Sequence, residues 1–212
     1  MAGMPLTNLK RGWVIHEHLP DALVTTSQFQ RLYAKPKRAY HNWSHIEACL
    51  AELSEFTQWA QQEGKRFEYV RVQAAILYHD VIYDPKAKDN EERSADLAVK
   101  SLRGVFSAKY RKTVKKLILY TKHTKLPTCF EGRIIVDIDL SILGQPRAAF
   151  DAYEKAIRKE YAWVPDDKFR TGRAAVLLHF LKRKRIYSTP YFFNKYEKRA
   201  RANLKRSLAK LL

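Results

Sequence analysis

Two histidines and two aspartates stand along the sequence in an order that could hold one divalent metal ion. His45 comes first, the adjacent pair His79 and Asp80 follows, and Asp139 comes last. Neutral imidazoles together with carboxylates suit Mn, Fe, Co, Ni or Zn and leave coordination positions for water and substrate. Mg also fits, although it usually takes more oxygen ligands. The plainer alternative is a core histidine with satisfied hydrogen bonds beside a helix-terminal acid.

The pair of His79 and Asp80 is notable because it ends an apolar run, residues 74–78. This run reads as a core helix, whose last turn would carry an imidazole and a carboxylate inward. Unpaired polar groups are costly there, and a bound ion would offset that cost. Neighbouring helical residues point about 100° apart. Both side chains could still reach one ion that lies beyond the helix end.

Three further side chains could serve chemistry at such a centre. Glu91 shares a helix face with small residues and could hydrogen-bond water held by the ion. His123 follows a lysine-rich helix, where it could cap the helix end through the dipole or reach into the site. His41 precedes an expected helix start, so it could face a bound phosphate or pack under the loop.

The elements that must position these residues are all expected to be helices. Apolar residues recur at three- and four-residue intervals, and Ser, Asn, Asp, Gly and Pro mark the ends. We expect a surface segment over 1–25 and one helical domain over 26–212. The helices are expected over about 27–34, 44–64, 67–80, 90–103, 107–122, 146–163, 167–187 and 192–212. Val176, Leu177, Phe180 and Leu181 are expected to point inward.

The segment 134–144 allows two structures. Its first half is rich in β-branched residues and would suit a strand. Its spacing favours a helix that ends at Gly144, because Ile135, Asp139 and Ile142 then share one face. On that helix Asp139 would lie on the buried side and Asp137 would not.

Composition indicates a compact globular chain with a basic end. The 212 residues are 46% apolar and carry a net charge of +18. Residues 155–212 hold 17 Lys and Arg against 4 Asp and Glu, which is either a solvated face or a surface for phosphate-rich partners. Two distant cysteines suggest a reducing compartment. No run approaches the roughly 20 apolar residues that cross a bilayer, so we expect a cytoplasmic protein without a membrane partner.

Four separated patches give the chain a family resemblance. They are residues 40–46 (YHNWSHI), 79–84 (HDVIYD), 89–95 (DNEERSA) and 137–144 (DIDLSILG). In this order the chain, from about residue 30 to 205, resembles the HD-domain metal-dependent phosphohydrolases. Their signature is His, then His-Asp, then Asp on a helical bundle. The resemblance is close to one small branch of predicted phosphohydrolases of about this length.

The resemblance implies an HD-type bundle that hydrolyses a nucleotide or another small phosphate ester through metal-activated water. The implied ligands of one ion are His45, His79, Asp80 and Asp139. Some HD enzymes hold a second metal through extra histidines. Here Asn90 and Glu91 occupy the corresponding helix start, which puts a second metal in doubt.

The same chemistry suggests roles for the remaining polar residues. Glu91 would orient or deprotonate the water. Arg38, His41 and His123 would neutralise phosphate charge, although Arg38 could equally be a surface arginine. The reaction could be that of a phosphomonoesterase, a phosphodiesterase or a nucleotidase.

The sequence also allows three other functions. The basic helices of 155–212 could bind nucleic acid or serve a nuclease, although they carry no recognised binding motif. An HD-like site could support a di-iron oxygenase, which needs two irons. A binding module could hold a purely structural metal, which would give a closed four-coordinate site.

Overall fold

A computed structural model describes residues 26–211, and every regular element in that range is helical. The α-helices are α1 (Thr26–Tyr33), α2 (Trp43–Gln62), α3 (Tyr69–Tyr78), α4 (Asn90–Ser101), α5 (Ala108–Tyr120), α6 (Phe130–Asp139), α7 (Arg147–Glu160), α8 (Asp166–Leu181) and α9 (Pro190–Leu211), and a short 3-10 helix, η1 (Leu140–Gly144), follows α6. The expected all-α class is confirmed for this range. The expected surface segment 1–25 lies outside the described residues.

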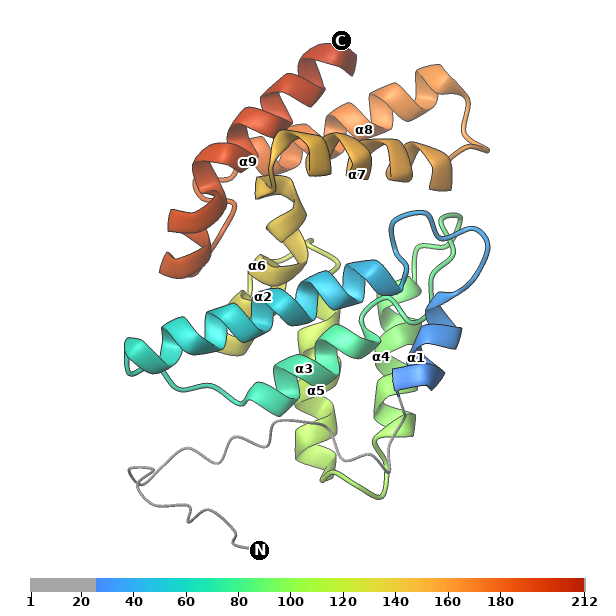
Figure 1. Cartoon of the computed structure of the whole chain (residues 1–212). Helices are drawn as coiled ribbons and strands as arrows, with labels where there is room; N and C mark the ends of the chain where they lie inside the picture. The colour runs from blue at the N-terminus through green and yellow to red at the C-terminus, as the bar shows by residue number, and fades with distance from the viewer. Residues whose placement is uncertain (1–25, 212) are drawn as a thin grey trace, which may run out of the picture.

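The helices form two groups on either side of α2 (Figure 1). In this view α3, α4 and α5 lie below α2, and α7, α8 and α9 lie above it. The helix α6 and its extension η1 connect the groups: α6 packs on α2, α3 and α5, whereas η1 packs on α7 and α9. No helix within 26–211 is both long enough and apolar enough to cross a membrane.

The start of α2 is set by a side-chain cap. The Asn42 side chain accepts a hydrogen bond from the Ser44 amide at 3.0 Å, which satisfies one of the free amides of the first turn. His41 therefore lies in the preceding loop, and His45 lies in the first turn of the helix. Both positions agree with the sequence prediction. His45 joins the buried face of α2 with Ile46 and Cys49.

The ambiguous segment is helical and Asp139 is largely buried as expected, but the expected exposure of Asp137 is wrong. Asp137 is fully buried, whereas the Asp139 side chain retains 16% exposure. The reason is the chain that enters α9, whose Ser188 and Thr189 amides donate to the Asp137 carboxylate at 2.8 and 2.7 Å. A second layer of helices therefore covers the side of α6 that a lone amphipathic helix would leave open.

The prediction that four residues of α8 point toward the core is only partly right. Leu177 and Phe180 are buried, and Leu181 packs against the core. Val176 is 42% exposed, contrary to expectation. The helix α8 packs on α9, and Val176 lies in the wall of a cavity instead.

A close approach between η1 and α9 gives a stability prediction. A Cβ added at Gly144 would lie 2.8 Å from Tyr196 Cγ, so Gly144→Ala should destabilise the fold by about 1–3 kcal/mol through overpacking. Gly172→Ala is the matched control, because its added Cβ meets no atom within 4 Å, and it should stabilise α8 by about 0.5–1 kcal/mol. Urea unfolding monitored by circular dichroism measures both. Equal stability of the two variants would contradict the assigned contact.

Candidate metal centre

The structure brings His45, His79, Asp80 and Asp139 together from three helix ends. His45 Nε2 lies 3.1 Å from His79 Nε2, 3.3 Å from Asp139 Oδ1 and 3.7 Å from Asp80 Oδ2. His79 Nε2 lies 3.1 Å from Asp80 Oδ2 and 3.6 Å from Asp139 Oδ1. Ligands bound at about 2.0–2.2 Å from one ion need separations of this order.

The hydrogen bond of the His79 ring also suits a metal ligand. Its Nδ1 lies 2.8 Å from the Ile76 carbonyl oxygen, which can only accept, so Nδ1 carries the proton. The neutral ring then presents the lone pair of Nε2 to the cluster, as in metal-ligating histidines whose other nitrogen donates to a carbonyl. Burial alone lowers the pKa of His79, but Asp80 and Asp139 outweigh it and raise that pKa. The cluster therefore favours positive charge, and the donor set fits a divalent ion.

Cys49 also lies beside this cluster. Its Sγ is 3.7 Å from His45 Nδ1, and it forms a close group with His45 and Asp139. Burial raises the pKa of its thiol well above the ordinary value, whereas metal binding requires the thiolate. We therefore assign Cys49 to packing against the His45 ring.

His123 contacts the carboxylate of Asp139 from the other side. Its Nε2 lies 2.9 Å from Asp139 Oδ2, so the two oxygens of Asp139 face different partners. His123 has a left-handed backbone with φ +57°, which is uncommon for a residue other than glycine. The Arg183 guanidinium donates a hydrogen bond to the His123 carbonyl oxygen at 2.8 Å. His123 therefore reaches into the site, which is one of the two positions that the sequence allowed.

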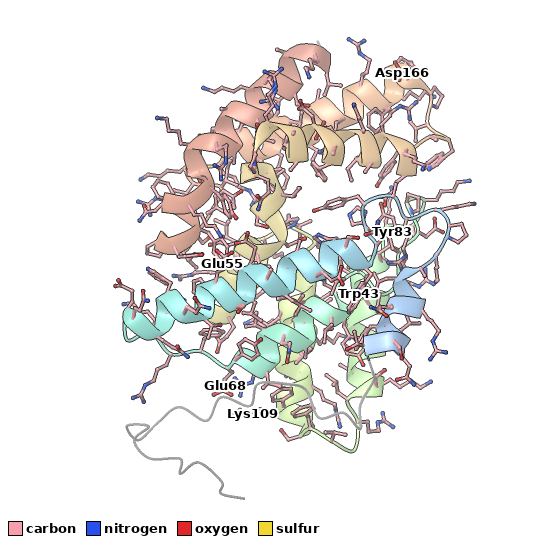
Figure 2. All side chains as sticks on the ribbon, viewed as in Figure 1. Trp43, Glu55, Glu68, Tyr83, Lys109 and Asp166 are labelled. Atoms are coloured by element: carbon pink, nitrogen blue, oxygen red, sulfur yellow. The ribbon has the colours of Figure 1, made fainter. Side chains whose placement is uncertain are left out.

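His41 is held by a residue that the sequence did not single out, Glu160. Glu160 Oε2 lies 2.6 Å from His41 Nδ1, and Oε1 accepts from the amides of Tyr40 and His41 at 2.7 and 2.9 Å. Tyr83 donates to Glu160 at 2.7 Å and stacks on His41 with ring centroids 4.1 Å apart. Figure 2 shows Tyr83 beside the start of α2, facing the hairpin of α7 and α8. Glu160 sits in a charged helix, where nothing in the sequence distinguishes it from a surface acid.

Arg38 is neither a surface arginine nor a residue of the cavity wall. It is buried, and its guanidinium donates to the carbonyls of His41, Asp80 and Val81 at 2.9, 2.6 and 2.9 Å. Its two terminal nitrogens thus bind the backbone that carries the site. This placement disfavours the expected contact with substrate phosphate.

A cavity of about 750 Å³ opens beside the cluster. His41, Asp80, Glu91, His123 and Asp139 all lie in its wall. Burial raises the pKa of Glu91, and Asp80 adds to that rise although Lys122 opposes it. A half-buried carboxyl with a raised pKa in a cleft has the character of a general acid or base.

The contact between Glu160 and His41 predicts a pH effect. Burial lowers the pKa of His41, but Asp80 and Glu160 raise it above the ordinary 6.5. Burial raises the pKa of Glu160, but His41 and two amides lower it to about 2. The stability from this pair is therefore lost as the pH falls towards 2, and also as it rises through the raised pKa of His41.

Glu160→Gln should accordingly lower the pKa of His41, which an NMR titration of the ring nitrogens measures. Glu154→Gln is the control, because it removes another carboxylate of the same helix that pairs with Arg173. An unchanged pKa of His41 in Glu160→Gln would contradict the assigned role of Glu160.

The comparisons with known proteins add no relative. No protein-family model, no curated protein and no solved structure matches this chain. The site is therefore interpreted from the residues and the geometry of this chain.

Proposed function

We infer that the chain is a metal-dependent phosphohydrolase of the HD-domain type, acting on a nucleotide or another small phosphate ester. The observation that carries this inference is the cluster of His45, His79, Asp80 and Asp139 in and behind the wall of a ligand-sized cavity. Two imidazoles and two carboxylates leave open positions on a divalent ion. The unpaired cysteines Cys49 and Cys129 support a reducing compartment, and hence the cytoplasm.

The residues around the cluster have different roles in the proposed hydrolysis. A divalent ion held by His45, His79, Asp80 and Asp139 would supply Lewis acidity for the activation of water and the polarisation of the phosphoryl group. Glu91 accepts the proton from the attacking water, for which its raised pKa suits it. His123 orients Asp139 through the bond to Oδ2. His41, whose pKa Asp80 and Glu160 raise, would offset the charge of the phosphate when its ring is protonated.

One ion is proposed in preference to two. Among residues 26–211, both close groups of potential metal ligands contain His45, so they describe a single centre. A di-iron oxygenase would need a second set of ligands. The alternative of a purely structural metal is disfavoured by the cavity against which Asp80 and Asp139 lie.

The structure also reduces the case for nucleic-acid binding through residues 155–212. Most arginines of this region donate to acceptors of the same chain. These pairs are Arg158 with Tyr161 and Val164, Arg170 with Leu211, Arg173 with Glu154, Arg183 with His123, Arg199 with Gly144, Arg201 with Glu197, and Arg206 with Asp151. Of these, Arg170, Arg173 and Arg206 join α7, α8 and α9 to one another.

The test is elemental analysis of protein purified without added metal, followed by phosphate release from a nucleotide panel after Mn or Co is added. About one metal per chain with metal-dependent phosphate release is the expected result. Two irons per chain would favour the oxygenase. If the protein contains no metal and shows no turnover, the inference is contradicted. The cluster would then be a polar part of the core whose hydrogen bonds are satisfied.

A further inference from the structure

The cavity beside the metal cluster has two chemically different ends. The cluster end carries the carboxylates and imidazoles described above. The other end is apolar and comes from α7, α8 and the turn between them. Its side chains are Ile157, Val164, Phe169 and Val176. Phe180 of α8 lies nearer the cluster, with its ring centroid 5.7 Å from that of His123. A bare phosphate would fill little of a space of about 750 Å³, which is typical of pockets for whole small molecules.

The apolar end leaves hydrophobic surface open to solvent. Phe169 and Val176 share one face of α8, and Phe169 is only partly buried. Val176 is 42% exposed in the cavity wall. Contact between water and such a surface is unfavourable, so a ligand group that covers it gains binding free energy.

Gly172 enlarges this apolar end. It lies in the middle of α8, where glycine costs helix stability relative to alanine. It also lines the cavity, and a Cβ built on it would meet no atom within 4 Å. The missing side chain therefore leaves free volume beside Phe169 and Val176.

The charged side chains of the cavity wall differ in whether they already have a partner. Arg173, the guanidinium of this wall, pairs with Glu154 and stands over the Tyr153 ring at 5.1 Å. Its charge is thus already used within the chain. Lys122 also lines the cavity and pairs with Glu92. Lys88 and Lys168 line it as well, and their charge favours the approach of an anion.

We propose that the substrate is a phosphate monoester whose alcohol carries a flat aromatic group, which occupies the space beside Gly172. This proposal rests on the inferred phosphohydrolase activity, since it puts the phosphate at the metal cluster. The water oxygen bonds to phosphorus, the ester P–O bond breaks, and the alcohol leaves with a proton. The aromatic group is selected by shape and apolar contact, without a hydrogen-bonding code.

The first arm of the test compares kcat/KM for 2-naphthyl phosphate and methyl phosphate. Wild-type protein should prefer the naphthyl ester. Gly172→Trp fills the space and should lower the ratio of the two values about 100-fold, within the range that pocket fit supplies. Ala175→Trp is the matched control, because Ala175 is an exposed residue of the same helix outside the cavity wall. It should keep the wild-type ratio.

The second arm measures binding of (2-naphthylmethyl)phosphonate, which has no ester bond to hydrolyse, by isothermal titration calorimetry. Weaker binding by Gly172→Trp without turnover by any variant would support the aromatic subsite and contradict the phosphohydrolase. Turnover of both esters with a ratio that Gly172→Trp leaves unchanged would overturn the subsite and keep the phosphohydrolase. If circular dichroism shows Gly172→Trp unfolded, Gly172→Leu should give a smaller fall in the ratio, and no fall would overturn the proposal.

Discussion

Asp80→Ala is expected to abolish both metal retention and hydrolysis while it leaves the helices intact. The carboxylate lies 3.1 Å from His79 Nε2 and faces the cavity, so its loss removes a ligand and a negative charge together. Replacing even a residue that only supports a ligand typically costs about 10–100-fold in metal affinity or activity. Loss of the ligand itself should exceed that range. Metal content and phosphate release, measured on the same preparation, check the prediction.

The fold should tolerate Asp80→Ala because the loop is held by main-chain atoms. Arg38 donates to the carbonyl of residue 80 at 2.6 Å, and the substitution leaves that carbonyl in place. Asp96→Ala removes an exposed acid of α4 that pairs with Lys115. It is the matched control and should keep both metal and activity. Full metal occupancy in Asp80→Ala would contradict the ligand assignment.

Glu91→Gln is expected to retain the metal but to slow turnover by about 10²- to 10⁴-fold, the usual contribution of a positioned acid or base. The amide keeps the shape of the side chain but cannot accept the proton. Burial, with help from Asp80, raises the pKa of Glu91. The basic form therefore appears at a higher pH than for an ordinary glutamate, and wild-type kcat/KM should rise with pH through that raised pKa.

In Glu91→Gln, kcat/KM should be lower than in wild-type protein and should no longer rise with pH through the raised pKa of Glu91. Glu92→Gln is the matched control, because Glu92 is adjacent, more exposed and paired with Lys122. It should change turnover little. An unchanged rate in Glu91→Gln would exclude Glu91 as the base and move the role to Glu92 or away from the side chains.

Local signals in the sequence were sufficient to predict much of the fold. The Asn42 cap placed His41 in a loop and His45 in a first turn, and both placements are confirmed. The helical interpretation of 134–144 is also confirmed. These features depend on residues a few positions apart, which periodicity and capping rules describe well.

The errors and omissions depend on contacts between distant segments. Asp137 is buried because α9 arrives more than 50 residues later in the chain. Glu160 bonds to His41 across more than 100 residues. Gly172 lines a cavity whose wall also includes residues of α7 and of the segments around the cluster. Side-chain spacing along one helix carries no information on which partner covers it.

The Arg38 guanidinium has a consequence for the entropy of ligand binding. It bonds to the loop that carries His41 and also to the turn that follows His79. The loop that carries His41 and the turn that carries Asp80 are therefore joined in one frame. Such a frame has little conformational freedom to lose when a substrate arrives, so its organisation is supplied by folding and not by the binding step.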